Sequence, residues 1–194
     1  MLSIMDRIAR TMAVIGGGVL VALVLLVCIS VSGRRLNTLG HSEWFAWISQ
    51  TMADALVATG VRPITGDFEI LEAGVAFAIF SFLPICQLYG AHATVDIFTN
   101  GLPSKINRWI VIFWEFVLTA VIILITWRLF AGMQSKLSNG ETTFLLQFPI
   151  WWAYAASFAA AVVASLVGAY TAFARVAEAV TGRKYLPYSE GAIH

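Results

Sequence analysis

The chain contains few charged residues and almost no cysteine. Asp, Glu, Lys and Arg make up 12% of its 194 residues, against roughly 25% in ordinary soluble domains. The mean hydropathy is +0.82, so a water-soluble fold is excluded. Its two cysteines, Cys28 and Cys86, lie late in two successive apolar stretches. Antiparallel neighbours would place them near opposite membrane faces, which predicts neither a disulfide nor a metal site.

The residue patterns of common enzymes are also missing from the sequence. There is no glycine-rich phosphate loop, no histidine pair for haem within the apolar stretches, and no nucleophile with a base at a useful spacing. A formal net charge of +1, without a basic stripe, argues against nucleic acid as a partner. We therefore expect a protein that is not an enzyme and that has no cofactor and no metal.

What the chain does have is four long apolar stretches, at about residues 11–33, 69–91, 108–128 and 148–174. A helix of roughly 20 residues crosses a hydrocarbon core about 30 Å thick. These stretches predict an all-α integral membrane protein, a single domain over residues 1–194 with a tail at 175–194. The first stretch is too long for a signal peptide, so it is expected to be a retained helix. Gly16, Gly17 and Gly18 predict a face on which a neighbouring helix packs closely.

The first connection has its own helical periodicity. Apolar residues recur from Trp44 and Trp47 onward, which predicts an amphipathic interfacial helix over about 43–59. The sequence leaves open whether this helix lies on lipid or on protein.

Lys and Arg set the expected orientation. With the N-terminus inside, seven of them fall on the cytoplasmic side and five on the other, which predicts both termini in the cytoplasm. Tryptophans near the ends of the crossings are expected to anchor the helices at the membrane surface. These candidates are Trp44, Trp47, Trp109, Trp127, Trp151 and Trp152.

One carboxylate, Glu115, lies well inside a crossing. A buried acid needs a partner or must lose its charge, and Arg10 and Arg175 are the candidate cations. We expect a structural ion pair or subunit contact, with a proton or ion pathway as the alternative.

The acids at the start of the second crossing favour a simpler role. Glu69 and Glu72 are expected to stabilise the helix start, with Asp67 as a possible N-cap. His92, near Asp96, predicts a loop or headgroup contact, and a titrating switch is the alternative.

A resemblance emerges from the order of several short patterns. Gly66-Asp67-Phe68-Glu69 precedes the second crossing, Gly90 to Asp96 follows it, and Leu102-Pro103 leads to Arg108-Trp109. Gly140-Glu141-Thr142-Thr143 then leads to Pro149-Ile150-Trp151 before the last crossing. Over about residues 66–155 the chain resembles the small Q-type (DctQ-like) membrane subunit of TRAP (tripartite ATP-independent periplasmic) transporters.

The resemblance implies a part in ion-coupled, ATP-independent uptake across the bacterial inner membrane. The expected partners are a large M-type (DctM-like) subunit of the elevator type and a periplasmic solute-binding protein. The solute would be an organic anion such as a carboxylate. Substrate and sodium sites would belong to the large subunit, and this chain would brace it. Residues expected to orient helices or to contact that partner are Glu69, Glu72, His92, Asp96, Arg108 and Glu115. Two alternatives stay open: a self-sufficient oligomeric channel or exporter, and the membrane anchor of a redox complex.

Overall fold

Four long helices form the described part of the chain. The computed structural model describes residues 2–41, 64–90, 104–183 and 185–186. The helices are α1 (Leu2–Gly40), α4 (Asp67–Tyr89), α5 (Ser104–Asn139) and α6 (Trp151–Thr181). Each is long and apolar enough to cross a membrane, so the four predicted membrane-spanning helices are confirmed. The interfacial helix predicted at 43–59, with Trp44 and Trp47, lies outside the described residues.

Three of the helices extend well beyond the predicted crossings. α1 runs from Leu2 to Gly40, whereas the crossing was predicted at about 11–33. α5 runs to Asn139, not to about 128, and α6 runs to Thr181, so the predicted tail at 175–194 begins inside a helix. Hydropathy marks only the apolar part of a helix, whereas backbone hydrogen bonds carry the helix on into polar sequence. α5 and α6 each stop at a glycine with left-handed backbone angles, Gly140 (φ 63°) and Gly182 (φ 70°).

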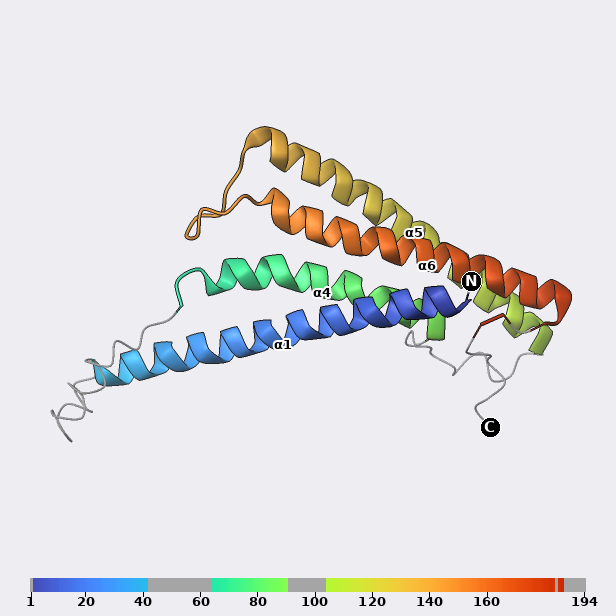
Figure 1. The fold of residues 1–194 in the computed structure, drawn as a ribbon, viewed down its shortest axis with the longest axis horizontal. Helices are drawn as coiled ribbons and strands as arrows, with labels where there is room; N and C mark the ends of the chain where they lie inside the picture. Colours follow the sequence, from blue (N-terminus) through green and yellow to red (C-terminus); the bar gives the residue numbers. More distant parts are fainter. Residues whose placement is uncertain (1, 42–63, 91–103, 184, 187–194) are drawn as a thin grey trace.

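The helices lie in an open row in the order α1, α4, α6, α5. α1 packs on α4, α4 on α6, and α6 on α5, while α1 touches α6 only slightly. Figure 1 shows the α1–α4 pair beside the α5–α6 pair, with α6 next to α4. α6 has two neighbours because small residues recur among its buried positions, and small residues let helices approach closely in lipid. These small buried residues are Ser157, Ala160, Ala161, Ala164, Gly168, Ala172 and Ala174.

The predicted glycine packing face is present at its first position. A Cβ on Gly16 would lie 2.6 Å from the Cβ of Ser81 on α4, so the two helices approach more closely there than a side chain at residue 16 would allow. Gly18 faces open space, with nothing within 4 Å of a Cβ built on it. The face therefore covers part of the glycine run and not all of it.

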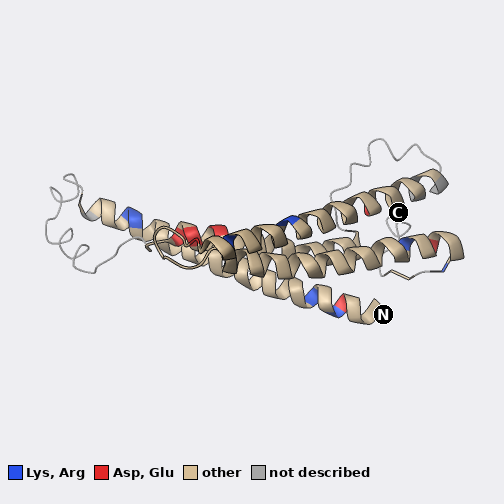
Figure 2. Ribbon diagram, turned by 90° about the horizontal axis from the view of Figure 1, so that it is seen from above, with Lys and Arg blue, Asp and Glu red and all other residues tan. Residues whose placement is uncertain are grey.

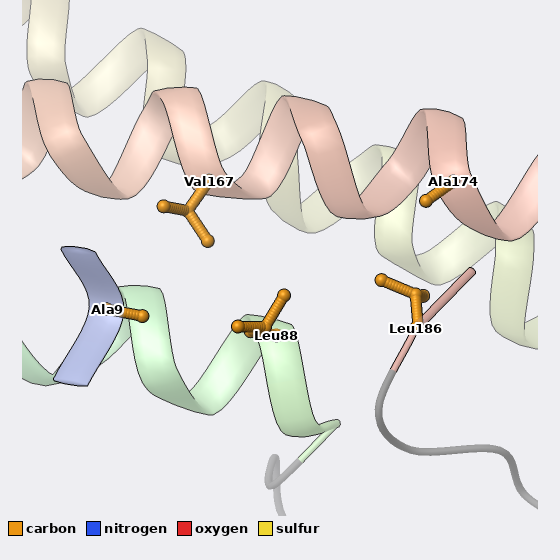
Figure 3. Close-up of a cluster of buried hydrophobic side chains, with 5 residues drawn as sticks. All are labelled: Ala9, Leu88, Val167, Ala174 and Leu186. Carbon is orange, nitrogen blue, oxygen red and sulfur yellow. The ribbon is translucent and has the colours of Figure 1, made fainter. Parts of the chain in front are cut away.

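A small apolar cluster joins three helices to the segment that follows α6. Figure 3 shows Ala9, Leu88, Val167, Ala174 and Leu186 facing one another. Leu186 reaches the cluster because Glu178 accepts hydrogen bonds from the backbone N–H groups of Tyr185 and Leu186, at 2.5 and 2.8 Å. Leu186, which lies in the segment predicted to be a tail, therefore packs against this end of the row.

Candidate partner-interface and helix-orienting residues

Most charged residues lie toward the two ends of the row (Figure 2). At the end where α1 begins, Arg10 donates from Nη2 to the hydroxyl of Tyr89, at 2.5 Å. That hydroxyl donates in turn to Asp6 Oδ1 at 2.7 Å, and Asp6 also pairs with Arg10. The three residues join the start of α1 to the end of α4. Arg10 is thus bound within this group, and the prediction that named it as a partner for Glu115 is wrong.

Glu115 pairs with the other predicted cation. Its Oε2 lies 3.3 Å from Nε of Arg175, and the two residues are 6% and 9% exposed. The pair joins α5 to α6. The position of this pair along the row can be judged from a contact between α4 and α6. Gln87, near the end of α4, lies against Gly168 of α6. Arg175 is therefore about five residues, or roughly 8 Å, beyond the level at which α4 ends. The pair lies toward one end of the row, not at its middle.

A second polar group lies where α4 begins. Ser30 of α1 donates to Asp67 Oδ2 at 2.5 Å, and Arg34 lies 3.6 Å from the same oxygen. The prediction of Asp67 as an N-cap is wrong, because α4 starts at Asp67 and the cap position is Gly66. The carboxylate of Asp67 is directed to α1, which hydropathy alone could not indicate.

Glu69 contacts the α5–α6 connection. Its two carboxylate oxygens accept the backbone N–H groups of Leu145 and Leu146, at 2.6 and 2.9 Å. Glu69 lies in the first turn of α4, where its negative charge was expected, and its hydrogen bonds add a tertiary contact that the sequence did not indicate. Gly66 permits the close approach, because its φ is 78° and a Cβ there would overlap the side chain of Leu146. Residues 66–69 therefore hold the connection against α4.

The connection is also braced at its own start. Lys136 donates to Glu141, with 2.5 Å between Nζ and Oε2, and Asn139 donates to the other oxygen at 3.2 Å. The hydrogen bond from Lys136 lowers the pKa of Glu141 below its ordinary value of 4.5. Backbone bonds between Thr143 and Phe148 and between Glu141 and Ile150 complete a compact turn.

A cavity of about 320 Å³ lies beneath this turn, between α4 and the facing parts of α5 and α6. Among its polar lining residues, Glu72 is exposed and makes no ion pair or hydrogen bond with any described residue. Ser157 is 2% exposed, and its hydroxyl has no hydrogen-bond partner in the described part of the chain. The complete lining is Glu69, Glu72, Ala73, Ala76, Leu129, Thr143, Phe148, Ile150, Ala153, Tyr154 and Ser157.

The predicted tryptophan anchors do not share one level. Trp109, Trp127 and Trp152 are 61%, 63% and 57% exposed, and Trp151 packs edge-on against Trp152. Thr126 hydrogen-bonds the carbonyl of Ala161 on α6. Trp127 of α5 therefore lies beside a part of α6 that is about ten residues, or roughly 15 Å, beyond Trp151. Of the other predicted site residues, His92 and Asp96 lie outside the described residues, and Arg108 is in α5 without a described side chain.

Sequence reasoning missed the contacts made by uncharged polar residues inside the crossings. Thr126 of α5 and Ser165 of α6 hydrogen-bond to each other at 2.9 Å. Gln87 is fully buried, and its amide has no hydrogen-bond partner among the described residues. A glutamine inside a long apolar stretch was the signal that could have drawn attention to it.

Comparison with known families decides what these helices belong to. The model of a family described as tripartite ATP-independent periplasmic transporters, DctQ component, matches residues 23–178. The chain belongs to the DctQ family. The match extends beyond the stretch at 66–155 that carried the resemblance, and it includes the second part of α1 and nearly all of α6. No curated protein and no solved structure matched the chain. DctQ is a transporter component and not an enzyme family, and it is the small subunit of the TRAP transporter.

Proposed function

We propose that this DctQ chain is the fixed scaffold on which the large, elevator-type DctM subunit of a TRAP transporter moves. The complex would import an organic anion, most simply a carboxylate, that a periplasmic binding protein delivers. Import would be driven by an ion gradient, with sodium as the expected ion. In this proposal the solute and ion sites lie in the large subunit.

The ion pair between Glu115 and Arg175 carries the proposal. These are the two buried charged residues in the described part of the chain, and each serves the other. A buried pair of this kind fixes how two helices sit against each other. At the opposite end Glu69 and Asp67 likewise join separate elements. Charges that tie helices together suit a scaffold that must resist movement.

The open row of helices also supports a scaffold role. A row exposes two long faces, whereas a closed bundle hides much of its surface. Many large apolar side chains are exposed along α1 and α5, as expected for surfaces that meet lipid or a membrane partner. The row could therefore widen the large subunit sideways within the bilayer.

For orientation, we propose that both termini face the cytoplasm. α1 begins and α6 ends at the same end of the row (Figure 1). Arg7, Arg10, Arg175 and Arg183 lie in or next to the helices at that end, in keeping with the enrichment of Lys and Arg on the cytoplasmic side. A cysteine placed at Arg7 should then react with a membrane-permeant maleimide and resist an impermeant one in intact cells.

Reconstitution tests the proposed function. The chain, the large subunit and the binding protein would be purified, and labelled organic acids offered to vesicles that carry a sodium gradient. Uptake should require all three proteins, and the small chain should copurify with the large subunit in mild detergent. Uptake by the small chain alone, or undiminished uptake when it is omitted, would overturn the proposal. A proton gradient in place of sodium tests the coupling ion separately.

A further inference from the structure

The cavity beneath the α5–α6 connection has features that packing alone does not explain. Its volume of about 320 Å³ falls at the low end of the roughly 300–1,000 Å³ typical of ligand pockets. Its walls are mostly apolar, and three helices and the connection contribute to them. A space of this size is large enough to receive a side chain from a neighbouring helix.

Two of the polar groups that line the cavity are left to accept hydrogen bonds from a cation. The carboxylate of Glu72 is unpaired among the described residues, although it lies less than two turns inside an apolar helix. Glu69, beside it, is already occupied by the N–H groups of Leu145 and Leu146. Ser157 supplies a buried hydroxyl that lacks a partner in the described chain. A carboxylate near hydrocarbon calls for an opposite charge, and a guanidinium or ammonium group brings several donors at once.

The position of the connection indicates the direction from which such a cation comes. Thr143, Phe148 and Ile150 of the connection line the cavity, and Figure 1 shows the connection at the end of the row where α4 and α6 begin. Glu69 holds it in place there. The connection therefore covers the side nearest the membrane surface, where a lipid headgroup would have to remain. A side chain from a helix lying alongside can instead enter within the plane of the bilayer.

We propose that this cavity is the socket for a basic side chain, Arg or Lys, on a transmembrane helix of the large subunit, with Glu72 as its counter-ion. The proposal rests on the proposed function, since it names the contact through which the scaffold holds its partner. Ser157 accepts a further hydrogen bond from the same group or orients it. The apolar walls, including Ala73, Ala76 and Leu129, pack around the stem of the basic side chain.

Charge-neutral substitution in the complex tests the socket. Glu72→Gln keeps the size of the side chain and removes its charge. The large subunit retained on the tagged small chain should drop by about tenfold or more, because removing one member of a desolvated charge pair typically costs that much in affinity. Glu72→Asp, the matched control, keeps the carboxylate and should retain most of the partner. Equal elution of the variants in gel filtration shows that each still folds.

A photoreactive residue in place of Ala76 identifies the occupant. Illumination of cells that express the whole complex should give an adduct with the large subunit, mapped to a helix that carries Arg or Lys. Exchanging the charges, with Glu72→Lys and an acid at the mapped position, should restore copurification. An adduct with phospholipid alone would show a lipid amine in the cavity and overturn the proposal.

The outcomes separate this inference from the proposed function. If the unmodified chain fails to copurify with the large subunit, both fall. If it copurifies but Glu72→Gln retains the partner as well as the unmodified chain does, only the socket falls.

Discussion

Gly168 of α6 lies directly against the side-chain amide of Gln87 on α4. A Cβ on Gly168 would come within 2.6 Å of Nε2 and 2.7 Å of Oε1. Gln87 is fully buried, so its amide has little room to withdraw. The α4–α6 contact, which joins the two halves of the row, therefore depends on a glycine at this position.

Gly168→Val should weaken this contact. Overpacking of a closely packed interior typically costs about 1–3 kcal/mol, so the melting temperature of the purified chain in detergent should fall. Gly18→Val is the matched control, because a Cβ there meets nothing within 4 Å. Equal losses of melting temperature in the two variants would mean that replacing a helical glycine with valine is itself destabilising, and that the contact with Gln87 is not the cause.

Gln87→Met should leave the chain as stable or make it more stable. The buried amide has no hydrogen-bond partner in the described part of the chain, and an unsatisfied buried polar group costs about 1–3 kcal/mol. Met is similar in length and lacks that requirement. Thermal unfolding in detergent checks the change. A marked loss of stability would reveal a bound water or another donor on the amide.

Breaking the pair of Glu115 and Arg175 should destabilise the α5–α6 contact strongly. Removing one member of a buried ion pair leaves the other uncompensated and typically costs about 3–5 kcal/mol. Arg175→Met should therefore lower the melting temperature more than Arg128→Met, since Arg128 is exposed. The exchange Glu115→Arg with Arg175→Glu should recover part of the loss. If the melting temperature does not recover, the loss comes from other contacts of the two side chains.

The existence of the four helices could be predicted from sequence because apolar length alone requires them. Their ends could not, since polar residues such as Lys136 continue a helix that hydropathy has already ended. The contact between Glu115 and Arg175 was predictable in kind, because a buried acid near hydrocarbon needs a cation. For Asp67 and Glu69 the sequence shows a position at the start of their own helix, but it does not show which atoms of neighbouring elements they contact. Ser30 and the N–H groups of Leu145 and Leu146 are those neighbours, and only the tertiary arrangement reveals them.

Glu69→Gln should loosen the α5–α6 connection without unfolding the helices. The change removes the negative charge that strengthens the hydrogen bonds from Leu145 and Leu146. Amide hydrogen exchange at these two positions should speed up, while exchange in the middle of α6 stays the same. Glu72→Gln, one turn away and without contact to those N–H groups, serves as the control. Unchanged exchange at Leu145 and Leu146 in Glu69→Gln would show that other contacts hold the connection.

The contact between Lys136 and Glu141 should make the start of the connection sensitive to acid. The hydrogen bond from Lys136 lowers the pKa of Glu141 in the folded chain. A lowered folded pKa means that the folded state binds its proton less readily than the unfolded state. The stabilising contribution is therefore fully present above the ordinary pKa of 4.5. It is lost as the pH falls from that value through the lowered one.

Hydrogen exchange or limited proteolysis of residues 139–143 should therefore increase below about pH 4.5, when corrected for the intrinsic effect of pH. Glu141→Gln should remove this dependence and leave the segment equally loose across the range. Lys136→Met should act in the same direction, because it removes the donor that lowers the pKa. A pH dependence that survives in Glu141→Gln would assign it to a different carboxylate, with Asp67 and Glu69 at the same end of the row as the candidates.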